Sequence, residues 1–237
     1  RWSKVLQPPP LATVLPLLQG GAAMLFRQLA INIGFLVATR RAQVMDPTGV
    51  AGAAYGITMQ IYAVGIIMLV AMQNCAAALV PASLAKSGKD HARKTADRLF
   101  TWSSLAGLLL GLTQFLLLPV LVPVFSTLPA VQEAVKLPAL IASLIHVVNG
   151  PILAGEGVMI GLGCYKDLAL ITFGWIGAMV ACLKSPLGQR LDGIMWSILL
   201  SSLVQQAGVI FHYLKVGPLA LRKNKKRNEG SQATGEG

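Results

Sequence analysis

The sequence predicts an all-α integral membrane protein, a bundle of six transmembrane helices, from its composition, its long apolar segments and the positions of its charges. Of 237 residues, 54% are hydrophobic and only 12% are charged, and the mean hydropathy is +0.64. Soluble domains carry roughly 25% charged residues, so this chain lacks the polar surface that a water-soluble globule needs. The 20 Lys and Arg, against 9 Asp and Glu, cluster between the apolar segments, which favours a membrane protein over a nucleic-acid-binding protein.

Six stretches are long and apolar enough to cross a bilayer, which requires about 20 residues of helix. They are residues 14–38, 49–84, 99–125, 138–162, 168–183 and 194–214. We expect the first helix to end before Arg40, Arg41 and the breaker Asp46-Pro47, and Thr48 to cap the second helix. The charged turn 86–90, with a glycine at its centre, should separate the second helix from the third.

These segments predict three parts of the chain. They are an N-terminal segment (1–13), a six-helix membrane lobe (14–220) and a disordered basic tail (221–237). Most Lys and Arg fall in the N-terminal segment, the second and fourth loops and the tail, so the positive-inside rule assigns both termini to the cytoplasmic side. We expect a multi-pass protein of the plasma membrane or of an organellar membrane such as that of a plastid.

Polar side chains recur on single faces of four expected helices. The sets are Gln28, Asn32 and Thr39 in the first helix, Gln60 and Asn74 in the second, His146, Asn149 and Glu156 in the fourth, and Ser201, Gln205 and His212 in the sixth. In hydrocarbon a polar side chain is costly unless it faces a partner or a water-filled cavity. The stripes therefore indicate either a hydrated central cavity or interhelical hydrogen bonds.

Glu156 is the strongest single candidate for a functional residue, because it is the one carboxylate deep inside an expected helix. It could load and release a proton, or it could be a hydrogen-bonded structural group. His146 could contribute to the same cavity or satisfy a neighbouring carbonyl. Arg27 lies a few turns from the cytoplasmic end of the first helix and could snorkel there or contact a substrate.

Three segments resemble the C-terminal half of multidrug and toxic compound extrusion (MATE) transporters, most closely their DinF-like branch. They are 49–55 (GVAGAAY) with Gln60 and Ile61, 82–90 (ASLAKSGKD) with Ala92, and 155–157 (GEG) with Gly161, Gly163, Tyr165 and Asp167. In order, they resemble the start of that family's eighth helix, the turn into its ninth and the end of its tenth. The resemblance runs from about residue 15 to residue 216.

This resemblance implies one lobe of a twelve-helix transporter, with helices seven to twelve in this chain and an N-terminal six-helix lobe as partner. It also implies a cation-coupled antiporter, a secondary active transporter that exports small organic compounds or xenobiotics with a proton or sodium as coupling ion. Some relatives carry a coupling glutamate on helix seven, where this chain has Gln28 and Asn32. Glu156 is therefore the coupling candidate within this lobe.

The candidate substrate-cavity or coupling residues are Glu156, His146, Asn149, Gln28, Asn32, Gln60, Asn74 and Gln205. Two alternatives stay open, a flippase for lipids or lipid-linked oligosaccharides from the same superfamily and a non-transporting membrane scaffold. An enzyme is not expected, because the sequence has neither HExxH nor GxSxG. The lipid bilayer and a small molecule are the expected partners, without nucleic acid. No cofactor is expected, and no metal site, since the three cysteines form no CxxC pair.

Overall fold

The structure, a computed structural model, describes residues 11–220, which form helices and turns without a β-strand in that range. The elements are α1 (Leu11–Met45), α2 (Val50–Phe125), α3 (Pro129–Gly161), α4 (Tyr165–Lys184), the 3₁₀ helix η2 (Pro186–Gln189), α5 (Leu191–Phe211) and the π-helical turn η3 (His212–Val216). In the described range, five helices are long and apolar enough to cross a membrane. The predicted all-α, multi-pass membrane fold is therefore confirmed.

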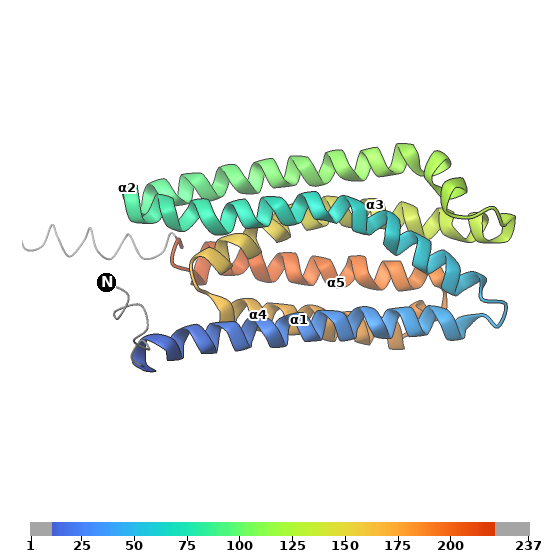
Figure 1. The fold of residues 1–237 in the computed structure, drawn as a ribbon, viewed down its shortest axis with the longest axis horizontal. Coiled ribbons are helices and arrows are strands. Elements are labelled where there is room, and N and C mark those ends of the chain that lie inside the picture. Colours follow the sequence, from blue (N-terminus) through green and yellow to red (C-terminus); the bar gives the residue numbers. More distant parts are fainter. Residues whose placement is uncertain (1–10, 221–237) are drawn as a thin grey trace, which may run out of the picture.

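The predicted count of six separate helices is wrong, because the expected second and third helices form one element, α2, of 76 residues. A straight helix of that length would extend roughly 110 Å, far beyond a hydrocarbon core of about 30 Å. At Gly88 the backbone is non-helical (φ 79°, ψ −176°), and Figure 1 shows α2 folding back into two arms. Ser83 Oγ and Thr95 Oγ1, one from each arm, lie only 3.1 Å apart. The expected turn therefore consists of one non-helical residue, Gly88, with helical backbone on both sides.

The start of α2 also differs from the prediction, because its N-cap is Gly49 and not Thr48. Gly49 adopts φ 79°, a left-handed conformation that glycine tolerates. The carboxylate of Asp46 accepts hydrogen bonds from the backbone amides of Thr48 (2.9 Å) and Ala51 (3.4 Å). The hydrogen bond from the Thr48 side chain is the main cause that lowers the pKa of Asp46 from its usual value, and the bond from the Thr48 amide adds to it. α1 ends at Met45, directly before Asp46-Pro47 as expected, but it includes Arg40 and Arg41, which were expected to lie beyond the helix.

Two further boundaries differ from the sequence prediction. α1 begins at Leu11, inside the expected N-terminal segment, and α3 begins at Pro129, well before residue 138. Proline is tolerated in the first turn of a helix, where its missing N–H would have no partner. Residues 1–10 and the expected tail 221–237 lie outside the described residues.

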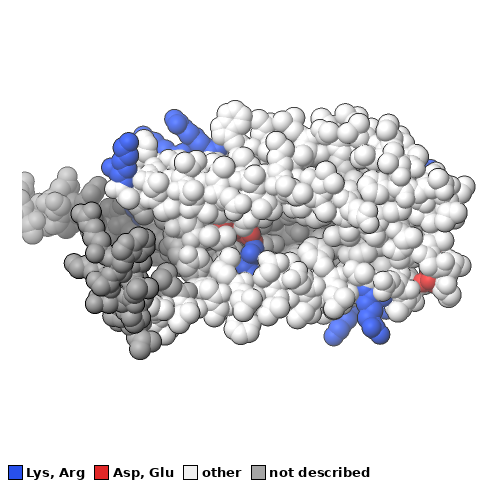
Figure 2. Space-filling view, in the orientation of Figure 1, with Lys and Arg blue, Asp and Glu red and all other residues white. Residues whose placement is uncertain are grey.

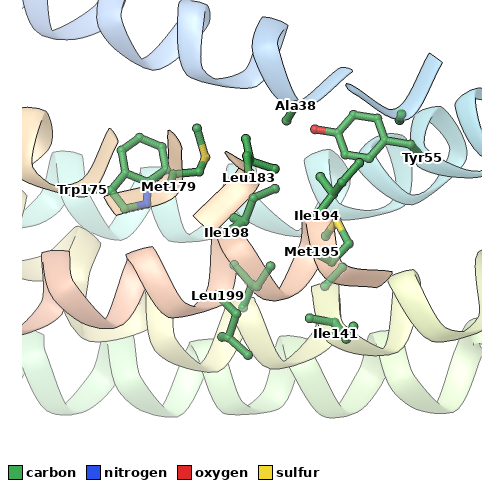
Figure 3. Packing of buried hydrophobic residues seen from close by; sticks show 13 residues of the cluster. Ala38, Tyr55, Ile141, Trp175, Met179, Leu183, Ile194, Met195, Ile198 and Leu199 are labelled. Atoms are coloured by element: carbon green, nitrogen blue, oxygen red, sulfur yellow. The ribbon is translucent and has the colours of Figure 1, made fainter. Parts of the chain in front are cut away.

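α3 and α5 lie at the centre of the bundle. In its most apolar stretch, 56% of α3 and 50% of α5 is buried, against 17% in both α1 and α2. α3 packs against both α2 and α5, whereas α4 packs against α5 and α1. Figure 3 shows the apolar cluster that joins these helices, with Ala38, Trp175, Met179 and Ile198 among its members. Many other large apolar side chains are exposed, among them Leu36, Val64 and Leu116, as contact with lipid requires.

One end of the bundle gathers the turn of α2, the α3–α4 connection and the end of α5 (Figure 1). There Lys89 Nζ donates a 3.0 Å hydrogen bond to the carbonyl of Ala220, and Arg93 donates to that of Leu219. A Cβ on Gly20 of α1 would lie 2.7 Å from the Tyr165 ring at the start of α4. The loops that the charge pattern assigned to one side of the membrane therefore lie at one end of the molecule.

Glycines allow the second arm of α2 to cross α3 closely. A Cβ on Gly150 would lie 2.5 Å from the carbonyl oxygen of Ser103, and one on Gly107 would lie 2.5 Å from that of His146. Backbones can approach this closely only where side chains are absent. These two positions therefore set the distance between α2 and α3.

Replacing Gly150 with Ala should destabilise the bundle by about 1–3 kcal/mol, the usual cost of overpacking a close contact. Gly177→Ala is the matched control, since a Cβ there meets nothing within 4 Å and alanine favours helix. Thermal unfolding in detergent measures both variants. Equal melting temperatures for Gly150→Ala and Gly177→Ala would contradict the assigned crossing.

Candidate functional site

A buried ion pair lies at the centre of the bundle. Arg27 on α1 donates through Nη2 to Oε1 of Glu156 on α3, and the two residues are 8% and 1% exposed. Arg27 Nε also donates to Thr172 Oγ1 of α4, at 2.9 Å. Figure 2 shows blue and red atoms meeting in a hollow of an otherwise largely uncharged face. Each charge therefore has its counter-charge at a position where both side chains are almost fully buried.

Two glutamine side chains complete the shell around the Glu156 carboxylate. Gln73 Nε2 of α2 donates to Oε2 at 2.8 Å, and Gln205 Nε2 of α5 donates to Oε1 at 2.7 Å. With Arg27 and Thr172, each of the five described α-helices contributes one side chain to this network, which we call the Arg27–Glu156 network. Both oxygens of the Glu156 side chain therefore accept hydrogen bonds from neighbouring helices.

The glycines on either side of Glu156 explain how α3 brings it so close to its partners. A Cβ on Gly157 would lie 2.2 Å from the Gln73 carbonyl oxygen, and one on Gly155 would lie 2.1 Å from Val209 Cγ1. Any side chain there would hold α2 and α5 away from α3. The Gly-Glu-Gly sequence thus positions the carboxylate within reach of both glutamines.

A cleft of about 170 Å³ opens beside the network. Its lining comes from all five described α-helices: polar residues Arg27, Tyr62, Asn149, Glu156, Ser202 and Gln205, with apolar Ile31, Phe35, Ile66, Ile145, Ile152, Leu153, Trp175 and Ile198. The wall is mainly apolar, and three of its polar residues, Arg27, Glu156 and Gln205, belong to the Arg27–Glu156 network. This combination suits an organic molecule with one polar or charged group.

His146 and Asn149 form a second polar cluster on α3. Asn149 Nδ2 donates to the Tyr62 hydroxyl at 2.6 Å, and the Tyr62 ring stacks on His146 with centroids 4.8 Å apart. His146 Nε2 lies 2.9 Å from Gln114 Oε1. Because Gln114 Nε2 donates to the Ala139 carbonyl, its oxygen is the acceptor and His146 Nε2 carries the hydrogen. Asn149 lines the cleft, whereas His146 lies behind Tyr62.

The other predicted site residues divide into two groups. Gln205 is buried in the Arg27–Glu156 network, whereas Gln28, Asn32, Gln60 and Asn74 are exposed on the outer faces of α1 and α2. Gln28 and Asn32 share a face as the spacing predicts, with their amide groups 3.5 Å apart. The exposed four do not contact Glu156 in this arrangement of the chain.

Sequence reasoning missed Gln73 and Thr172 as members of the site, and left Arg27 without a partner. One signal could have identified the ion pair: Arg27 and Glu156 are the two opposite charges deepest in the expected helices, and buried charges in membranes pair with each other. Gln73 carries no comparable signal. It adjoins Asn74, and only the rotation of α2 decides which amide faces inward.

No family model matches this sequence, and no curated protein matches it.

Two solved structures share its fold, each at 18% sequence identity. One is a MOP superfamily transporter from Pyrococcus furiosus, whose description reports a binding pocket of reverse polarity suggesting a different function; it matches with a TM-score of 0.69 over 85% of this chain. The other is a multidrug resistance MATE family transporter of the MOP superfamily in an outward-facing conformation, with a TM-score of 0.68 over 88% of this chain. The match spans only 43% and 47% of those two proteins. At this identity the likeness concerns the fold, and we conclude that this chain has the fold of part of a MOP superfamily transporter.

Proposed function

We propose that this chain is one lobe, the C-terminal one, of a secondary active transporter that exports small organic compounds in exchange for a cation. The observation that carries the proposal is the Arg27–Glu156 network beside a cleft. Ionisable residues inside membrane helices are costly and mark ion or substrate pathways more often than packing sites. Likeness in fold to two transporters supports the same conclusion.

In the proposed mechanism, Glu156 exchanges its partner Arg27 for a proton. The two residues lie on different helices, α1 and α3, so a shift of α1 would separate them. A carboxylate without a counter-charge in a dry environment is less costly to bury once protonated. Proton uptake would thus accompany the conformation in which Arg27 is free to bind an anionic group of the substrate.

The Arg27–Glu156 network favours this exporter over a lipid or lipid-linked oligosaccharide flippase. A flippase for pyrophosphate-linked or phosphate-linked lipids requires several inward-facing cations. Among the described residues, Arg27 is the only buried Lys or Arg, and its charge is already matched by Glu156. A complementary N-terminal lobe would supply the other wall of the substrate pathway.

Glu156→Gln should abolish transport driven by a pH gradient, because an amide cannot take up the proton. Glu133→Gln is the control, since Glu133 is exposed and paired with Lys136. The measurement is substrate efflux from vesicles that carry the full transporter, with and without a pH gradient. A Glu156→Gln transporter that kept its pH dependence would remove Glu156 from the coupling mechanism.

Arg27→Met should destabilise the chain by about 3–5 kcal/mol, since it leaves a buried carboxylate without a counter-charge. The double variant Arg27→Met, Glu156→Gln should lose less stability than Arg27→Met alone, because neither charge remains. Thermal unfolding in detergent, compared across the single and double variants, measures the coupling. Strictly additive effects would contradict the buried pair.

Cysteines at Asn32 and Gln60 should react with membrane-impermeant thiol reagents if these exposed amides face a hydrated pathway. The experiment uses a variant without the native free cysteines in vesicles with the full transporter. Leu170→Cys provides an exposed apolar control on α4, 69% exposed, which lipid should protect. Complete protection of both test positions would argue against a pathway along α1 and α2.

A further inference from the structure

We propose that Cys164, Asp167 and His212 form a binding site for a divalent transition metal, with zinc the ion that fits best. The site lies at the end of the bundle where the α3–α4 turn meets the end of α5. One donor atom from each residue lies within 4.8 Å of the other two. His212 Nε2 and Asp167 Oδ2 are already 3.1 Å apart.

The backbone around the α3–α4 turn fixes two of these side chains. Gly163 adopts φ 73°, a left-handed conformation, and lets the chain reverse direction between the helices. The amide of Cys164 then donates a 2.8 Å hydrogen bond to the carbonyl of Met159. Cys164 becomes the N-cap residue of α4, and Asp167 follows in the first turn. Residues three apart lie on the same side of a helix, so their donor atoms point to one region.

The third side chain comes from the end of α5. His212 begins the π-helical turn η3, and Gly217 donates a 2.7 Å hydrogen bond to its carbonyl. A Cβ on Gly217 would lie 2.9 Å from the Cε1 atom of the His212 ring, so the imidazole packs directly against that glycine. The ring is only 7% exposed, and Nε2 is directed at Asp167. Isolated π-helical turns occur often at functional sites.

The donor set suits zinc better than magnesium or calcium. Thiolate and imidazole ligands select zinc and similar ions, whereas magnesium and calcium require oxygen donors. Metal–ligand distances of about 2.0–2.3 Å place the donor atoms of a tetrahedral site about 3–4 Å apart, so small side-chain rotations would close the set. A thiolate and a carboxylate together neutralise a divalent cation, and the fourth position stays open for water or another ligand.

An ion can reach the site from the surface. A cavity of about 360 Å³ is lined by Cys164, Lys166 and Asp167, together with Gln19 and Gly20 of α1. The side chain of Asp167 is 49% exposed. The alternative is a purely structural role, in which the hydrogen bond between Asp167 and His212 joins the two helices without a metal. That alternative gives the Cys164 thiol no role. The described contact of Cys164 Sγ is a weak one, 3.9 Å from the Leu162 carbonyl oxygen.

Cobalt(II) titration of the purified full chain in detergent, free of a polyhistidine tag, tests the proposal. We expect one equivalent of Co²⁺ to produce a thiolate-to-cobalt absorption band that Zn²⁺ displaces. Cys164→Ser should remove the band, and His212→Ala should weaken binding by about tenfold or more. Cys75→Ser and Cys182→Ser, which change the other two free cysteines, should leave it intact.

A second measurement needs no variant of the site, so it does not depend on whether such variants fold. In the unmodified chain, Zn²⁺ should slow the alkylation of Cys164 and leave the alkylation rates of Cys75 and Cys182 unchanged. Peptide mass spectrometry measures the three rates. Absence of the cobalt band together with unchanged alkylation of Cys164 would overturn the proposal. Both outcomes are independent of transport and so of the proposed function.

Discussion

The structure depends on keeping one pair of opposite charges, Arg27 and Glu156, inside a bundle that is surrounded by apolar surface. A single charge at the centre of a membrane helix costs about 2.5–3.5 kcal/mol on insertion scales. Here each charge meets the other. Thr172 accepts a hydrogen bond from Arg27, and Gln73 and Gln205 donate hydrogen bonds to Glu156. Since these five residues come from five different helices, the positions of the helices and the burial of the pair require each other.

The same pair connects α1 to the centre of the bundle. α1 has most of its apolar surface exposed and packs mainly on α4, where a Cβ on Gly34 would lie 2.7 Å from Met179 Cε. The ion pair is its polar link to α3, the most buried helix. Helices joined by such a charged contact can adopt two arrangements, one with the contact made and one with it broken. In the proposed mechanism, a proton or an anion that competes for either charge would shift α1 between these two arrangements.

Sequence patterns predicted the helical class and most helix ends, because both depend on local features. Apolar length indicated the membrane helices, and Asp46-Pro47 indicated the end of α1. The chain reverses within the expected turn 86–90, but a single residue, Gly88, makes the reversal, so the second and third helices form one element, α2. Helical spacing grouped Asn149 with Glu156 and selected Gln205. It could not select Gln73 over Asn74, since their difference arises from the rotation of α2 against α3.

The exposed amides on α1 and α2, like the buried pair, are subject to the cost of placing a polar side chain in hydrocarbon without a partner. Hydrocarbon offers no hydrogen bonds to the side chains of Gln28, Asn32, Gln60 and Asn74, yet these four are exposed on the chain as described. α1 and the first arm of α2 also border the cleft beside Glu156. The chain spans less than half the length of the two transporters whose fold it shares. Under the proposed function, water or a complementary lobe, and not lipid, would contact these amides, and this polar edge would continue the cleft into a pathway between two lobes.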